Sequence, residues 1–201
     1  MTNNQEKVKK LVLMGLLTAV LLVMSYTPLG YLNIGPLAIT LNVIPVAVAA
    51  ISLGPAAGAV MGAVFGLTSF LQCIGVGGMS AMGAVLFEIS PVLAFIQRFV
   101  PRVLMGFLVG LVYKAISKIN KPKIACFVSG FCAALFNTVL FMTALMLLFG
   151  SSDYVQELMG GKNVIVFICS FVGINAVFEM IASTLITGAV GTALKKAKLI
   201  K

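Results

Sequence analysis

The sequence LVLMGLLTAVLLVMSYTPLG, residues 11–30, opens a stretch without a single Asp, Glu, Lys or Arg that continues to residue 87. A helix crosses the hydrocarbon core of a membrane in about 20 residues, so this stretch is too long for one crossing. Glycine and proline interrupt helices and therefore predict where the crossings end. The stretch alone predicts several membrane-spanning helices joined by short turns.

The composition of the whole chain agrees with this interpretation. Of the 201 residues, 61% are hydrophobic and 9% are charged, and the mean hydropathy is +1.14. Soluble globular domains carry about 25% charged residues. No segment is polar enough to form a separate soluble domain, which excludes a water-soluble enzyme. We therefore predict an all-α polytopic membrane protein, with one transmembrane domain over residues 1–201.

Breaks at glycine, proline and polar residues divide the chain into six predicted spans. They cover about residues 11–26, 38–53, 56–74, 99–113, 124–149 and 163–194. Between the third and fourth spans, residues 75–97 are apolar but contain four glycines and a proline. We expect a long outer loop here, folded back onto the six-helix bundle, because irregular backbone at membrane depth must be covered by protein or a water-filled cavity.

The basic residues predict the orientation. With six spans, both termini lie on one side of the membrane, and eleven lysines fall on that side. They are Lys7, Lys9, Lys10, Lys114, Lys118, Lys121, Lys123, Lys195, Lys196, Lys198 and Lys201. By the positive-inside rule this side is the cytoplasm. The net charge of +9 is therefore a topology signal and does not indicate a nucleic-acid partner.

Seven polar side chains in or beside the spans are candidate substrate-binding residues, because such groups are costly in a bilayer and normally face protein or a cavity. They are Asn42, Gln72, Arg98, Arg102, Asn137, Asn175 and Glu179. At about 1.5 Å per residue, all but Glu179 fall in the outer half of the bundle. Polar groups from five helices beneath a glycine-rich loop are what a small-molecule site with a lid requires.

Each candidate also has a structural interpretation. Amides hold helices together in lipid. Arg98 and Arg102, one helical turn apart, either bind a substrate carboxylate or phosphate or extend to the outer headgroups. Glu179 either binds substrate or contacts Asn175, one turn away.

Catalysis has little support in the sequence. The chain has no His, no second carboxylate within a span to pair with Glu179, and neither a zinc-protease nor a Walker motif. We expect no catalytic residue, no metal site and no cofactor. Because the sequence has neither a nucleotide-binding loop nor a series of Asp, Glu or His residues to relay protons, another protein must supply the energy for any transport. A membrane-embedded enzyme acting through Glu179 and a structural subunit without ligand are the alternatives from other functional classes.

The first span carries two small residues, Gly15 and Ala19, at positions i and i+4. This small-xxx-small spacing lets two helices approach closely in lipid. It marks a candidate surface for docking a partner helix.

These features occur together with three motifs and a basic N-terminus. Residues 53–58 read LGPAAG, Asn137-Thr138 lies in the fifth span, and Asn175-x-x-x-Glu179 lies in the sixth. In this order and spacing, they resemble the substrate-binding S-component of energy-coupling-factor vitamin transporters over nearly the whole chain. Glycine at position 15 departs from the usual Ala-xxx-Ala of that family, conservatively in size.

The resemblance implies a subunit that binds a water-soluble vitamin with high affinity and has no ATPase of its own. It implies docking through Gly15 and Ala19 onto a transmembrane coupling subunit, which carries two cytoplasmic ATPases. It also implies a location in a bacterial cell membrane, in which the subunit topples to carry the vitamin inward.

Three segments look most like the pantothenate subgroup: residues 28–36, residues 65–69 and Arg98-x-x-Pro101-Arg102. Pantothenate is a flexible, non-aromatic monocarboxylate, which suits arginine and several amides. The chain has no Trp, so the tryptophan platform that would suit thiamin is absent. Riboflavin and a folate or pyrimidine precursor stay open as substrates.

Overall fold

The computed structural model describes residues 3–32, 39–119 and 122–197, and almost all of its regular structure is helical. In chain order the elements are α1 (Asn3–Ser25), β1 (Tyr31–Leu32), β2 (Ile39–Thr40), α2 (Val43–Leu53), α3 (Pro55–Leu71), the 3-10 turn η1 (Gln72–Ile74), α4 (Ala81–Ile89), α5 (Pro91–Ser117), α6 (Pro122–Phe149), α7 (Asp153–Met159) and α8 (Val164–Lys196).

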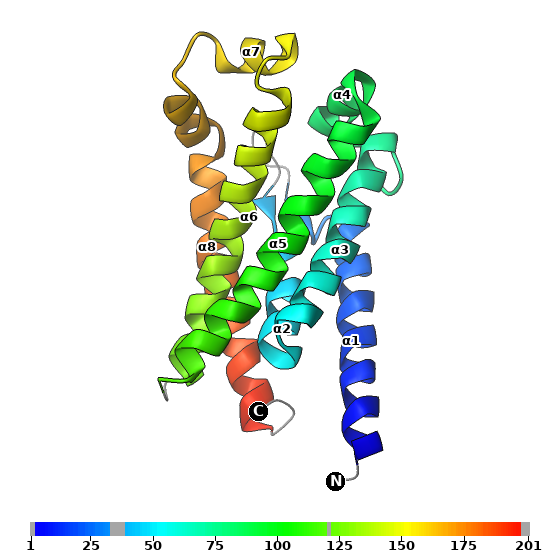
Figure 1. Ribbon diagram of the computed structural model, residues 1–201, viewed down its shortest axis with the longest axis vertical. Helices are drawn as coiled ribbons and strands as arrows, with labels where there is room; N and C mark the ends of the chain where they lie inside the picture. The colour runs from blue at the N-terminus through cyan, green and yellow to red at the C-terminus, as the bar shows by residue number, and fades with distance from the viewer. Residues whose placement is uncertain (1–2, 33–38, 120–121, 198–201) are drawn as a thin grey trace.

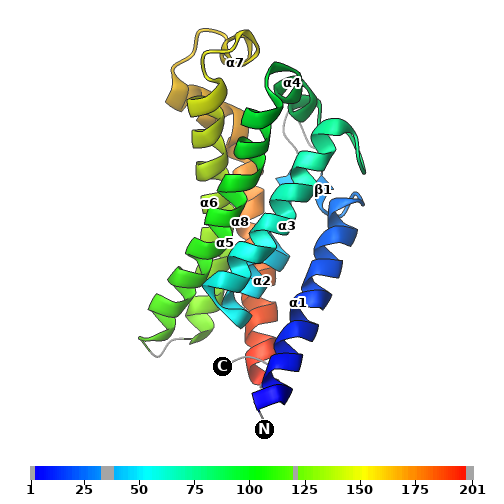
Figure 2. The same ribbon diagram turned by 45° about the vertical axis from the view of Figure 1, so that its right-hand side comes forward.

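The long helices form an elongated bundle (Figure 1). Helix α3 packs along α5, α5 along α6, and α6 along α8, while α1 stands at the edge and contacts α2 and α3 (Figure 2). One apolar core lies among α1, α2, α3 and α5. A second core joins α4, α6, α7 and the first half of α8.

Five helical segments in the described ranges are long and apolar enough to cross a membrane: α1, α3 with η1, α5, α6 and α8. The prediction of an all-α polytopic membrane protein is confirmed, apart from one pair of two-residue strands. The sixth apolar segment, α2, has 11 residues and extends about 16 Å, which is short of a full crossing. The count of six spans therefore stays a prediction.

The second predicted span does not begin as expected. Residue 38 lies outside the described residues, but Ile39 and Thr40 form β2, paired antiparallel with β1. Helix α2 begins only at Val43. Pro45 is its third residue, and a proline without an N–H is tolerated in a first turn, where no intrahelical acceptor is needed.

The expectation of one irregular loop over residues 75–97 is wrong. Residues 81–89 form α4, whose N-terminus is capped by the Ser80 hydroxyl accepting from Gly83 N at 3.2 Å. Ser90 caps α5 in the same way, and Pro91 occupies its first turn. Only residues 75–80, with left-handed backbone at Gly75, Gly77 and Gly78, form an open turn within this segment.

The proline expected to start the fourth span instead lies inside a helix. Pro101 is the eleventh residue of α5. Because proline has no N–H, the carbonyl of Gln97 four residues earlier loses its usual helical partner. This carbonyl accepts a hydrogen bond from Arg102 Nη1 at 3.3 Å. The interruption in the helix thus fixes the position of a charged side chain.

All the described lysines except Lys162 gather at one end of the bundle. We call this the lysine-rich end: it contains the start of α1, the end of α5, the start of α6 and the end of α8, all at the bottom of Figure 1. Of the eleven lysines predicted on one side, Lys121, Lys198 and Lys201 lie outside the described residues. Helices α4 and α7 lie at the opposite end.

Candidate functional site

A cavity of about 540 Å³ lies in the half of the bundle away from the lysine-rich end. Its walls come from the end of α1, the β1–β2 pair, η1, the glycine turn 75–80, and helices α4, α5, α6 and α8. A volume of this size is typical of sites for small molecules. The elements are far apart in the sequence, so the fold alone brings them together.

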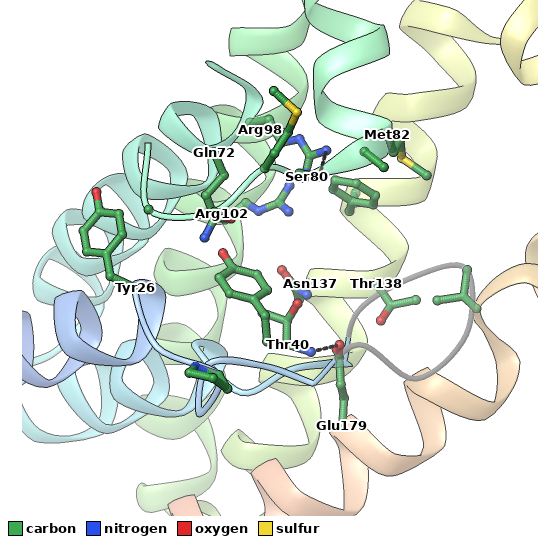
Figure 3. Close-up of a pocket in the computed structure, with 18 of the residues that line it drawn as sticks. Tyr26, Thr40, Gln72, Ser80, Met82, Arg98, Arg102, Asn137, Thr138 and Glu179 are labelled. Atoms are coloured by element: carbon green, nitrogen blue, oxygen red, sulfur yellow. Dashed lines mark hydrogen bonds between the residues drawn. The ribbon is translucent and has the colours of Figure 1, made fainter. Parts of the chain in front are cut away.

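Five of the seven predicted substrate-binding residues line this cavity. They are Gln72, Arg98, Arg102, Asn137 and Glu179. In Figure 3 the two guanidinium groups lie above the cavity, with Glu179 and Thr40 below. All five side chains are largely buried, so they are placed within the bundle and not toward lipid.

The other two predicted residues do not line the cavity. Asn42 is fully buried just before α2, and neither polar atom of its side chain has a partner among the described residues. Asn175 is buried on α8, one turn before Glu179.

The two arginines are 7% and 5% exposed, too little for side chains that extend to headgroups. Arg98 donates from Nη1 to Ser69 Oγ at 3.4 Å and from Nη2 to Ser80 Oγ at 3.3 Å. These bonds tie α5 to α3 and to the start of α4. The Nε–H groups of Arg98 and Arg102 are buried without a partner among the described residues, and both side chains line the cavity.

Close helix packing places both arginines. A Cβ atom added at Gly62 would collide with the carbonyl group of Arg102, so the absence of a side chain there lets α3 lie directly against α5. Aromatic rings complete the setting. Arg98 and Arg102 lie 5.3 and 4.4 Å from the centroid of the Phe141 ring, within the range of cation–π attraction.

Glu179 fastens the β1–β2 pair to α8. Its Oε1 accepts a hydrogen bond from the backbone N–H of Thr40 at 2.5 Å. A buried N–H without an acceptor is costly, so this bond stabilises the hairpin against the helix. It also gives the carboxylate a partner within the protein.

The glycine turn connects the cavity to the end of α1. Gln72 Nε2 donates to the Ser25 carbonyl at 2.9 Å. Gly77, at φ 77°, packs against the Tyr26 ring so closely that a Cβ atom would overlap it. Tyr26 and residues 77–80 all line the cavity.

The model of the family described as "ECF transporter, substrate-specific component" matches residues 9–191. This chain is a member of that family of energy-coupling-factor S-components. The resemblance noted from the sequence is thereby confirmed, and it identifies a component of a transporter and not an enzyme.

Two pantothenate transporters are similar to this S-component over almost their full length. The pantothenate transporter PanT of Leuconostoc mesenteroides subsp. mesenteroides is 29% identical over 204 residues, covering 96% of this chain and 95% of that protein. The pantothenic acid transporter PanT of Lactococcus lactis subsp. cremoris is 28% identical over 207 residues, covering 96% and 97%.

The cavity of this S-component has polar lining residues that the sequence analysis did not select as substrate-binding. They include Tyr31, Thr40, Ser80 and Thr138, of which Thr138 was noted only as part of a family motif. Ser80 and Thr138 lie in or beside apolar segments, where hydroxyl groups are too common to single out. Tyr31 and Thr40 belong to a hairpin of two-residue strands, which leaves no periodic pattern.

The predicted docking residues of the S-component lie on an open surface. Gly15 and Ala19 are exposed, and an added Cβ at Gly15 would meet no atom within 4 Å. Only 11% of the apolar window of α1 is buried, the smallest share among the five candidate spans. This face therefore has room for a partner helix or for lipid.

Proposed function

We propose that this S-component binds pantothenate in the cavity and carries it across the membrane. The observation that carries the proposal is the pair of buried arginines at a cavity with a single carboxylate among its described lining residues. The names of the two similar proteins support the same substrate.

The charges of the cavity favour a monoanion. Two guanidinium groups face it, and the carboxylate of Glu179 offsets one of them while it accepts from Thr40 N. One positive charge is left over, on guanidinium groups that line the cavity. A guanidinium group holds a carboxylate through charge-assisted hydrogen bonds, the stronger kind in proteins.

The rest of the lining suits the other groups of pantothenate. Hydroxyl and amide side chains from several elements provide partners for its two hydroxyls and its amide: Thr40, Ser80, Asn137 and Thr138. Met79, Met82, Met142 and Val172 provide apolar contacts for its dimethyl group.

A flat aromatic vitamin such as riboflavin fits this lining less well. The Phe141 ring already lies against both guanidinium groups. A second ring, Phe65, lies 5.4 Å from the Arg102 guanidinium. These two rings are therefore engaged by the protein. Tyr26 and Tyr31 stay available for stacking, so riboflavin is the second candidate substrate.

Calorimetry on the detergent-purified protein tests the substrate directly. We expect saturable, one-to-one binding of pantothenate, with a dissociation constant of about 1 μM or lower, and much weaker binding of riboflavin. If pantothenate gives no heat of binding and riboflavin or another vitamin gives saturable heat, the proposal of pantothenate is wrong and that vitamin is the substrate.

We further propose the transport setting that the family implies. The chain crosses the membrane six times, α2 with its preceding hairpin forming the second crossing, and the lysine-rich end faces the cytoplasm. Helix α1 docks through Gly15 and Ala19 onto a transmembrane coupling subunit, and two cytoplasmic ATPases supply the energy.

A further inference from the structure

A groove separate from the cavity described above opens near the lysine-rich end. It has a volume of about 420 Å³ and lies where the α2–α3 turn meets the last turns of α5. Its lining contains two exposed lysines, Lys114 in the last turn of α5 and Lys118 directly after that helix. No carboxylate lines it among the described residues.

Two hydroxyl groups beside these lysines have no partner. Tyr113 is 8% exposed, and its hydroxyl oxygen is buried without a hydrogen bond among the described residues. The same is true of Ser117 Oγ. A buried hydroxyl without a partner is costly, so a ligand acceptor here would recover a lost interaction.

The backbone between α2 and α3 adds no donor to the groove. The N–H of Gly54 donates to the Ala50 carbonyl at 3.0 Å, and Pro55, in the first turn of α3, has no N–H. The next two residues of α3 do not line the groove. The lysines therefore supply the attraction for an anion.

Donors and positive charges with no acid among them are the chemistry of a phosphate site. We propose that the groove binds a phosphate group, and that its occupant is the headgroup of an anionic phospholipid. Ile51 and Pro55 give the groove an apolar wall, which suits the glycerol end of a lipid better than a free ion. The groove also lies at the end of the apolar helices, where headgroups are found.

The test uses the full-length, detergent-purified protein and three probes: short-chain phosphatidylglycerol, phosphatidylcholine of the same chain length, and inorganic phosphate. Binding is followed by the melting temperature. We expect phosphatidylglycerol to raise it saturably and phosphatidylcholine to have little effect. The double variant Lys114→Gln/Lys118→Gln should bind phosphatidylglycerol about tenfold to thirtyfold more weakly.

The matched control is Lys195→Gln/Lys196→Gln, which removes the same charge at the same end but outside the groove. It should keep its affinity within about threefold. Tyr113→Phe should leave the unliganded melting temperature unchanged or raised, because the hydroxyl has no partner to lose, and should weaken phosphatidylglycerol binding.

Equal weakening in the two double variants, or no weakening in either, would overturn the site. Saturation by inorganic phosphate at the same concentrations, with the same dependence on Lys114 and Lys118, would support a phosphate site but overturn its assignment to a lipid. Neither result depends on which vitamin the other cavity binds.

Discussion

At the level of single residues, the substrate-binding candidates could be recognised by type but not by contact. An arginine within an apolar stretch is conspicuous, and both arginines line the cavity. What positions Arg102 is the carbonyl of Gln97, freed by Pro101. That relation requires Pro101 to lie inside α5, whereas the sequence placed it in a first turn. The effect of a proline on a helix could therefore be predicted from the sequence, but the residue at which α5 begins could not.

Gln97 itself was overlooked. It is fully buried, and neither polar atom of its side chain has a partner among the described residues. The criterion that selected Gln72 applies equally to it, an amide in an apolar segment. It was passed over because the sequence placed it in a loop.

We predict that Glu179 stabilises the β1–β2 pair and does not itself contact the substrate. In Glu179→Gln the amide oxygen still accepts from Thr40 N, so we expect the affinity for pantothenate to stay within about threefold of the parent or to rise. In Glu179→Ala the Thr40 N–H loses its acceptor, which costs about 1–3 kcal/mol and should lower the melting temperature. Calorimetry and thermal unfolding measure the two effects. If both variants lose affinity equally, the carboxylate contacts the substrate instead.

At the level of elements, the long helices were predictable and the short ones were not. A helix that crosses the membrane needs about 20 apolar residues, and a stretch of that length is easily recognised in a sequence. The helices α4 and α7 have 9 and 7 residues, and each strand has two. Short elements depend on tertiary contacts. Strand β2 is held by the hydrogen bond from Thr40 N to Glu179, and the turn before α4 is held by the packing of Gly77 on Tyr26. Such contacts cannot be predicted from the periodicity of the sequence.

We predict that substrate binding requires the close contact between Gly77 in the glycine turn and the Tyr26 ring. In Gly77→Ala the new methyl group would collide with the Tyr26 ring and displace residues that line the cavity. We expect pantothenate to bind about tenfold more weakly, from a left-handed backbone cost of about 1–2 kcal/mol together with the collision.

The control for this variant is Gly161→Ala. Gly161 has nearly the same backbone, φ 75°, but open space around it and no place in the cavity lining. Its affinity should change by less than about threefold, since the backbone cost falls outside the site. Equal calorimetric affinity in the two variants would refute a role for this contact in binding.

The first helix is predicted to dock a partner without touching the vitamin. Because Gly15 has open space around it, Gly15→Leu should fold with an unchanged melting temperature and bind pantothenate normally. It should fail to co-purify with the coupling subunit and should abolish uptake of labelled pantothenate by cells. Ala189→Leu, at an exposed position of α8, is the control and should retain both. Normal co-purification of Gly15→Leu would contradict docking through this face.

At the level of the whole molecule, the composition decided the class of protein, and the charges predict an orientation. The described lysines of α1, α5, α6 and α8 gather at one end of the bundle, while Glu88, Asp153, Glu157 and Lys162 belong to segments at the other. Such segregation is visible in the sequence once the spans are placed. The cavity is not, because its walls come from elements at opposite ends of the chain.

The orientation has its own test. Green fluorescent protein joined to the C-terminus should fluoresce in cells, and alkaline phosphatase joined there should be inactive, because the lysine-rich end is proposed to face the cytoplasm. Phosphatase inserted at Gly160-Gly161, at the opposite end, should be active. The reverse pattern would place the lysines outside.

The central claim is that Arg98 and Arg102 bind the carboxylate of pantothenate, and calorimetry with a matched ligand tests it most directly. Panthenol differs from pantothenate in carrying an alcohol in place of the carboxylate. We predict that the unaltered protein prefers pantothenate by about tenfold to a hundredfold, as expected of a charge-assisted hydrogen bond worth about 1.5–3 kcal/mol. Arg102→Gln should lose most of this preference, whereas Lys162→Gln, which removes an exposed charge, should keep it. Equal affinity of the unaltered protein for the two ligands would contradict the claim.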